Sequence, residues 1–484
     1  SNFRAGVNAG NSIASGGSQN VFIGDEAGTA QNTGVRSVFV GYKAGTAVTT
    51  GDSNVAVGWQ ALMTEDTNSN NTAIGASALQ TLNAGASGFN TAVGFEAGKA
   101  VTTGVQNTFI GGSAGDSLTD ADFNTAVGFD ALAADTQGSK STAMGRSALS
   151  SQNFTSATDS FNTAVGYFAG AGLQTGEGNT LIGGLASDAL TEGDANVVVG
   201  VGALGADTKG SRSVAIGMNA LETQNFTSAT NADNVAIGFE AAQALTTGGN
   251  LTAVGKGALA NCLTANNNTA VGLRALGSVT TGAQNTGMGR DAGFDITTGS
   301  DNVVIGASNG GASGRANAIV IGVGIDAGAN NQFRFGKASN RVANEFDTDN
   351  AWTRSSDERL KKNITNQTLG LDFINDLRTV KYNWKPNGEL DASDAQLAHL
   401  RRKDDDGNII NDMNTTATMH NFIAQEVKAA LDTAGVSNFG GWKEDEHGVQ
   451  QVSREMFVIP LVKAVQELST ALDAALARIV TLEG

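Results

Sequence analysis

Asn90-Thr91-Ala92-Val93-Gly94 is one copy of a five-residue cassette that recurs through the first 322 of the 484 residues. A polar residue comes first, then a small or β-branched residue, two mostly apolar residues and a glycine. Asn107-Thr108-Phe109-Ile110-Gly111 and Asn124-Thr125-Ala126-Val127-Gly128 repeat the cassette. Such a run is typical of one short strand, and its glycine allows the backbone to turn.

The cassette glycines lie 17 residues apart in thirteen of the eighteen intervals between Gly6 and Gly322. A fixed period over this length indicates a solenoid, in which each coil buries its apolar residues against its neighbours. We therefore expect residues 1–322 to form an all-β, parallel β-solenoid shaft. A second small-residue segment, such as Phe95-Glu96-Ala97-Gly98, predicts a second short strand in each coil and a flattened β-roll. Small inward residues predict a thin core, which favours packing of the shaft against copies of itself.

Longer coils recur at every fourth position, after Gly6, Gly75, Gly145 and Gly217. The last two contain the same insert, Gln-Asn-Phe-Thr-Ser-Ala-Thr, at 152–158 and 224–230. Extra residues in a solenoid coil form loops on one face. Two interpretations stay open: drift within a duplicated four-coil unit, or a ladder of contact loops. In the second, the candidate receptor-binding residues are Asn153, Phe154, Asn225 and Phe226.

The composition changes near residue 350. Residues 1–350 hold 56 of the 64 glycines, whereas both prolines (Pro386 and Pro460) and three of the four tryptophans follow. We predict three segments: the shaft over 1–322, a closing strand at 332–336 within a connector over 323–355, and a globular domain over 356–484. The net charge is −17 and both parts are acidic, which argues against nucleic-acid binding. The single Cys262 excludes an intramolecular disulfide.

The globular domain begins at Ser355-Ser356-Asp357-Glu358-Arg359-Leu360-Lys361-Lys362-Asn363-Ile364. We expect a helix at 369–377, a strand at 380–384, a helix at 422–427 and a final helix that opens at 457–468. This order of motifs resembles the self-cleaving intramolecular chaperone domain at the C-termini of phage tail fibres and tailspikes. The cassette rhythm of the shaft is similar to the head repeats of trimeric autotransporter adhesins.

The chaperone resemblance implies a serine–lysine dyad. Ser356 is the nucleophile, Lys361 is the base that takes its proton, and the bond between Ser355 and Ser356 is cleaved. Asp357, Arg359 and Asn363 are supporting residues. The chain departs from the family pattern at His420, which is displaced by one residue, so we expect a surface or packing histidine there.

The final helix, about 458–483, carries apolar residues at alternating spacings of four and three. This heptad seam is typical of a supercoiled bundle, and fibre trimers favour three strands. The alternative is one amphipathic helix folded onto its own domain. The seam consists of Leu461, Val465, Leu468, Leu472, Ala475, Ile479 and Leu482.

Together these features predict a bacteriophage tail fibre that forms a homotrimer and binds a host cell-surface glycan or protein. We expect assembly in the host cytoplasm, residence in the virion tail and attachment to other tail proteins through a part that precedes residue 1. No cofactor, metal ion, nucleic acid or membrane insertion is expected. The alternatives are a bacterial trimeric surface adhesin and a glycan-cleaving tailspike. A tailspike needs two facing carboxylates, whereas the acidic residues scatter over the turns, at Asp52, Glu65, Asp130, Asp135, Glu177 and Asp207.

Overall fold

The computed structural model describes residues 1–85, 87–310, 313–345, 353–354, 358–401, 403, 407–409, 415–416 and 418–483. The chain divides into two compact units, Ser1–Ser355 and Ser356–Gly484. The first is a parallel β-solenoid with about 17 residues per coil, and the second is a small α+β domain that ends in a long helix. The expected fold class is confirmed. No helix of the described residues is long and apolar enough to span a membrane.

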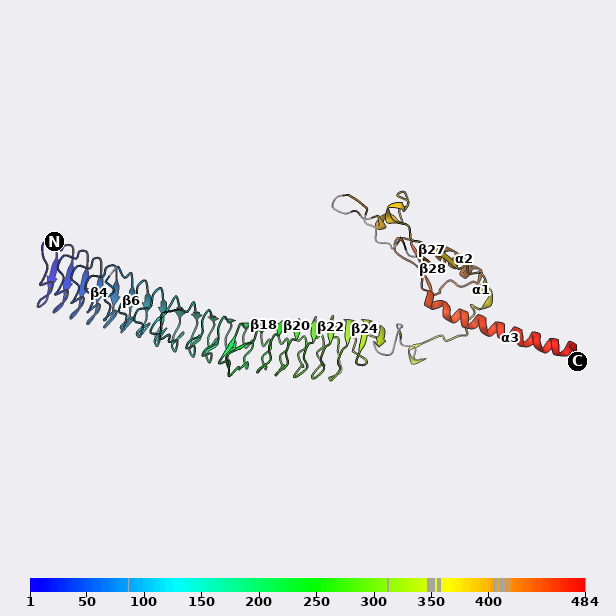
Figure 1. The fold of residues 1–484 in the computed structure, drawn as a ribbon, viewed down its shortest axis with the longest axis horizontal. Helices are drawn as coiled ribbons and strands as arrows, with labels where there is room; N and C mark the ends of the chain where they lie inside the picture. Colours follow the sequence, from blue (N-terminus) through cyan, green and yellow to red (C-terminus); the bar gives the residue numbers. More distant parts are fainter. Residues whose placement is uncertain are drawn as a thin grey trace. The chain divides into compact units, whose positions relative to one another are not determined.

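Each coil contributes one short strand to the large sheet, and Figure 1 shows the coils stacked one on the next. Neighbouring strands are parallel and in register with the cassette, so that Thr91 lies beside Thr108 and Ala92 beside Phe109. The strands are β1 (Phe3–Ala5), β2 (Val21–Ile23), β3 (Val38–Val40), β4 (Val55–Val57), β5 (Thr72–Ile74), β6 (Thr91–Val93), β7 (Thr108–Ile110), β8 (Thr125–Val127), β10 (Thr142–Met144), β12 (Thr163–Val165), β13 (Thr180–Ile182), β14 (Val197–Val199), β16 (Val214–Ile216), β18 (Val235–Ile237), β19 (Thr252–Val254), β20 (Thr269–Val271), β21 (Thr286–Met288), β22 (Val303–Ile305) and β23 (Ile319–Val323).

The cassette glycine is required where neighbouring coils touch. Gly94 has φ +144°, and a Cβ there would lie 2.3 Å from the carbonyl oxygen of Gly111. Both the left-handed backbone and the close approach exclude other residues. This explains why the glycines hold their period while the turns vary.

The second segment of each coil is made of turns, so the expectation of a second strand is wrong. Glu96 (φ +57°) and Gly98 (φ +59°) adopt left-handed conformations that an extended strand cannot contain. The segment still links the coils, because the Glu96 N–H donates to Ala76 O and the Gly98 N–H donates to Ala114 O, each at 2.9 Å. One regular strand per coil is therefore enough to stack the solenoid.

The core of the shaft is thin, as expected. A large side chain in the strand faces small residues in the turns, and a small side chain in the strand faces a large one. Phe109 fills the middle of β7, and glycines 98 and 115 of the facing turns leave room for its ring. In β8 the middle residue is Ala126, and Leu132 fills the space from the facing turn. Such alternation of large and small residues keeps the packing dense.

Buried asparagines at the start of the cassettes form hydrogen bonds with backbone N–H and carbonyl groups beside the strands. The Asn90 side chain accepts from the Asn107 N–H at 2.9 Å and donates to Gly104 O at 2.9 Å. Asn107 repeats the arrangement on Asn124 N–H and Ala121 O. This ladder explains the polar first position of the cassette, because buried backbone groups must be paired.

The shaft closes with β24 (Gln332–Lys337), which is parallel to β23 and antiparallel to β25 (Asn340–Glu345). The strand β26 (Thr353–Arg354) is antiparallel to β25. Short parallel pairs join β9 (Gly138–Ser139) to β11 (Thr158–Asp159), and β15 (Gly210–Ser211) to β17 (Thr230–Asn231).

The described residues of the second unit form two small antiparallel pairs, three α-helices and short 3₁₀ turns. Its elements are η1 (Glu358–Leu360), α1 (Leu371–Asn375), β27 (Val380–Tyr382), η2 (Asn387–Glu389), η3 (Ala398–Leu400), β28 (Met419–Asn421), α2 (Ala424–Thr433), β29 (Trp442–Glu444), β30 (Gln450–Val452), η4 (Arg454–Phe457) and α3 (Val458–Glu483). Strands β27 and β28 pair with Lys381 opposite His420, and β29 pairs with β30.

Candidate functional site

The predicted cleavage motif begins outside the described residues. Ser355, Ser356 and Asp357 are not described, so the separation of the nucleophile from its base is not defined. The structure resumes at η1, where the Lys361 N–H donates to Glu358 O at 2.9 Å and closes the turn. This turn fixes the backbone of the proposed base.

The described part of the motif lies at the surface. Arg359, Lys361 and Asn363 are exposed, and Asn363 has φ +56°, a left-handed conformation that asparagine tolerates. A lysine that accepts a proton from serine works best when it is shielded from water. If Lys361 acts as the base, other parts of the assembled protein must shield it.

The domain is built around one aromatic cluster. The ring centroid of Phe457, in η4, lies 5.0 Å from that of Phe422, 5.3 Å from that of Phe439 and 6.2 Å from that of Phe373. Phe373 belongs to α1 and Phe422 precedes α2, so the cluster joins four segments that are distant in sequence. The segments of Phe373, Phe422 and Phe457 were predicted from the sequence as motifs of the domain, whereas the segment of Phe439 was not.

Two polar contacts fix the helices around this cluster. Glu467 of α3 accepts a hydrogen bond from the Leu371 N–H at 2.7 Å and so caps α1. Arg378 pairs with Glu426 at the start of α2, and this hydrogen-bonded ion pair lowers the pKa of the Glu426 carboxyl. The pair is exposed and contributes orientation more than stability.

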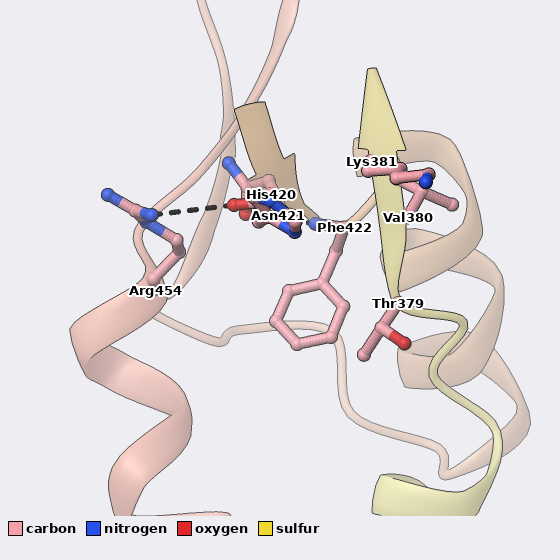
Figure 2. A pocket seen from close by; sticks show the side chains of 7 residues that line it. All are labelled: Thr379, Val380, Lys381, His420, Asn421, Phe422 and Arg454. Carbon is pink, nitrogen blue, oxygen red and sulfur yellow. Dashed lines mark hydrogen bonds between the residues drawn. The ribbon is translucent and has the colours of Figure 1, made fainter. Parts of the chain in front are cut away.

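A hollow of about 450 Å³ lies beside the β27–β28 pair (Figure 2). Its lining includes Lys381, His420 and Arg454, and it contains no carboxylate among its residues. Arg454 Nη1 donates to the carbonyl oxygen of His420 at 3.4 Å, which holds the guanidinium at one side. Sequence reasoning missed Lys381 and Arg454, although the alternation of residue types through 380–384 could have placed Lys381 on an outer face. His420 lies in β28 and is exposed, and the hollow shows no nucleophile–base pair.

The seam of α3 is uncovered in the single chain. Pro460 and Ala464 are the buried residues of this helix, near its start. The seam residues beyond them are exposed, with Leu468 at 51%, Leu472 at 60% and Ile479 at 48%. The alternative of one helix folded along its own domain is therefore wrong for most of its length.

The comparisons with known proteins assign the start of this second unit. Residues 356–436 match the family model described as chaperone of endosialidase. The match begins at the residue predicted to follow the cleaved bond and includes α1, β27, β28 and α2. No curated protein and no solved structure matches the chain.

The repeated inserts of the shaft are held by buried carboxylates. Asp135 accepts hydrogen bonds from the Gly138 N–H at 3.0 Å and the Phe154 N–H at 3.1 Å. Asp207 accepts equivalent bonds from Gly210 and Phe226, both at 3.0 Å. Burial raises the pKa of Asp135 despite these bonds. These two acidic residues therefore support loops from inside and do not face a groove.

The candidate receptor residues occupy different surroundings. Phe154 and Phe226 are buried, at 6% and 8% exposure. Asn153 accepts a hydrogen bond from the Thr136 hydroxyl, and Asn225 accepts one from the Thr208 hydroxyl, each at 3.0 Å. The exposed residues of the inserts are Thr-Ser-Ala at 155–157 and 227–229. Receptor binding by these loops stays a prediction, and it would use their tips instead of their phenylalanines.

Proposed function

We propose that the protein is a homotrimeric bacteriophage tail fibre that binds the host cell surface, and that its second unit is a self-cleaving assembly chaperone. One observation carries the proposal. A β-solenoid of near-identical coils is followed directly by a domain whose start, at residue 356, matches the chaperone of endosialidase. The host receptor is a glycan or protein, and other tail proteins hold the fibre.

The repeat itself explains why such a shaft needs a chaperone. Coils of equal height can pair between chains at many axial offsets, each with similar contacts. A domain without repeats can pair with its copies in only one alignment, and it therefore fixes the axial offset of the chains. The exposed seam of α3 supports this role, because an apolar helix face of this length is stable when other copies cover it.

The proposed cleavage is an acyl transfer followed by hydrolysis. Lys361 takes the proton of the Ser356 hydroxyl, and Oγ forms a bond to the carbonyl carbon of Ser355. The carbon–nitrogen bond between the two serines breaks, and the amine of Ser356 receives a proton. Water then hydrolyses the ester, which leaves a carboxylate on Ser355 and restores the Ser356 hydroxyl. The separated shaft is kinetically trapped, because the unit that could guide its unfolding has left.

The test measures mass and assembly on the same sample. Native mass spectrometry of purified protein should give a trimer, and denaturing mass spectrometry should give fragments that end at Ser355 and begin at Ser356. Adsorption of the trimer to host cells, without turnover of surface glycan, separates a fibre from a tailspike. A stable full-length monomer would contradict the proposal, and a trimer that stays uncut would leave a chaperone without peptidase activity.

A further inference from the structure

The outward face of the large sheet is uncharged along the whole shaft. In every three-residue strand of the large sheet from β2 to β22 the middle residue points inward, and the first and third residues point outward. The outward positions contain only threonine, valine, isoleucine and methionine. Most third-position isoleucines and both methionines are exposed, as with Ile110 at 41% and Met288 at 45%, whereas the third-position valines are half-buried. A protein of net charge −17 could place charges there at no cost to its core, and it places none.

The size of this face suits an interface. A strip about 10 Å wide and about 85 Å long, from strands three residues wide stacked at ~4.8 Å, covers roughly 850 Å². The face is not wholly apolar, because threonine fills ten of its seventeen first positions, but every third position is valine, isoleucine or methionine. One partner in a standard protein–protein interface contributes about 800 Å².

Two columns of side chains border the face, and over residues 89–167 their exposed aromatic residues fall on the same coils. Outside this range the columns differ, because exposed Tyr42, Trp59 and Phe239 lie in coils whose other column holds Arg36, Ser53 and Asp233. One column precedes the buried asparagine of the cassette, and the other follows the cassette glycine. Three coils carry an exposed aromatic residue in both columns, six residues apart: Phe89 with Phe95, Phe123 with Phe129, and Phe161 with Tyr167. The coils between them carry none in either column, with Gln106 and Gly112 in one and Lys140 and Arg146 in the next.

This matching identifies the partner. The two borders of one coil lie on opposite edges of its strand, so they do not complete one another within the chain. In a ring of parallel copies at the same height, one edge of each chain meets the opposite edge of the next. Over residues 89–167 aromatic edges then meet aromatic edges. A partner of unrelated sequence, or a copy displaced by one coil, would lose the match.

We infer that this face is the surface through which three copies of the shaft pack, parallel and in axial register, with the paired aromatic borders as its contacts. The inference rests on the proposed homotrimer and adds to it which surface is buried. It also gives the aromatic coils a role in register, since they recur every second coil over 89–167.

The backbone supplies an independent argument. Phe89, Phe123 and Phe161 have φ of +51°, +62° and +50°. Phenylalanine is unfavourable in this left-handed region, whereas asparagine is tolerated there. The isolated coil would therefore be more stable with asparagine. Retention of phenylalanine at three such positions is explained if the rings are buried between chains.

The decisive experiment is cross-linking of the full chain with a short bis-maleimide. In the Phe123→Cys/Phe129→Cys variant, opposite edges of neighbouring chains should be joined, and the main product should be a covalent trimer. Each single variant is the matched control and should give no covalent trimer, because neither edge meets itself. The native Cys262 is fully buried and should not react. A trimer by native mass spectrometry that the double variant cannot cross-link would overturn this interface and leave the proposed function intact, whereas a monomer would overturn both.

Substitution of the three left-handed aromatics gives a second measurement. The Phe89→Asn/Phe123→Asn/Phe161→Asn variant should keep its β-sheet circular dichroism and lower the urea midpoint for trimer dissociation. Gln106→Asn, in the same column, should leave the midpoint unchanged. An unchanged or raised midpoint in the triple variant would contradict the inference.

Discussion

The side-chain amide of Gln152 donates a hydrogen bond of 2.6 Å to the carboxylate of Asp135, one coil away. Asp207 and Gln224 repeat the pair at 2.6 Å. Both pairs are fully buried and occupy a column that mostly holds apolar residues, such as Leu118 and Leu173, although buried Gln31 and Glu65 also belong to it. Each pair marks the beginning of a long coil, so a polar substitution inside the core accompanies the insert outside it.

We expect Asp135→Leu to destabilise the shaft by about 2–4 kcal/mol, although leucine suits this column in other coils. The change leaves the Gly138 and Phe154 N–H groups and the Gln152 amide without their acceptor, and unpaired buried donors are costly. Urea unfolding followed by circular dichroism measures the loss. The control is Asp135→Asn, which keeps one acceptor oxygen and should cost less. Equal stability of all three proteins would contradict the proposed role.

Phe154 and Phe226 should act as structural residues. The Phe154 ring lies close enough to Gly138 that a Cβ there would come within 2.8 Å of it. Replacement of both phenylalanines with serine should lower the melting temperature and leave adsorption to host cells unchanged. The control replaces the exposed Thr155 and Thr227 with alanine. If adsorption falls in the phenylalanine variant while the melting temperature holds, these side chains contact the receptor after all.

The stability of the shaft should fall as the pH rises through neutrality, because of Glu65. Desolvation raises the pKa of this buried carboxyl from 4.5 to about 7. A carboxyl with a raised folded-state pKa stabilises the fold below pH 4.5, and this stability is lost as the pH rises through about 7. The difference is on the order of 3 kcal/mol per chain. Its Oε1 accepts from the Asn68 N–H at 2.6 Å, whereas Oε2 has no partner among the described residues.

Glu65→Gln should remove this pH dependence, because an amide keeps the acceptor and cannot ionise. Melting temperatures at pH 5 and pH 8 should differ less in this variant than in the parent. Glu177→Gln, at an exposed turn, is the control and should behave like the parent. If the parent is equally stable at both pH values, ionisation of Glu65 does not destabilise the fold, and the prediction is wrong.

The repeat in the sequence was sufficient to predict the solenoid, because glycine at the cassette end is dictated by contact with the next coil. Other features depend on individual residues and their packing, which the spacing of the glycines does not predict. The turns of the second segment follow from left-handed residues such as Glu96, whose sequence gives no strong signal. The inward position of Phe154 depends on the small Gly138 one coil earlier. A column-by-column alignment of the coils could have found the Asp135–Gln152 pair, because a charged residue there replaces leucine.

The candidate site was predicted from a resemblance, and the family match at 356–436 supports the domain without testing the dyad. The structure adds two findings: Lys361 is exposed, and Lys381 and Arg454 line a basic hollow. The hollow forms from three segments, around 380, 420 and 454, that no local pattern connects. The dyad stays a prediction for mutagenesis.

Cleavage should require Ser356 and Lys361 and should not require Lys362. Ser356→Ala removes the nucleophile, and Lys361→Ala removes the group that takes its proton, so both variants should remain full-length trimers. Lys362→Ala is the matched control and should be cut like the parent, with a fragment that runs from Ser356 to Gly484. Denaturing mass spectrometry after prolonged incubation measures each result. Loss of cleavage in Lys362→Ala alone would move the base by one residue.

Trimer formation should depend on the seam of α3. The Leu468→Ser/Leu472→Ser variant removes two adjacent seam contacts, each of which would be buried in a bundle, and large apolar residues lost from a core cost about 2–5 kcal/mol each. Three chains contribute, so we expect assembly to fail and the uncut chain to appear as a monomer in sedimentation. Val480→Ser is the matched control, because Val480 is 69% exposed and lies beside the seam without belonging to it. The domain itself should stay folded in both variants, since its core is centred on Phe457 and does not include Leu468 or Leu472. A fully trimeric seam variant would show that another surface aligns the chains.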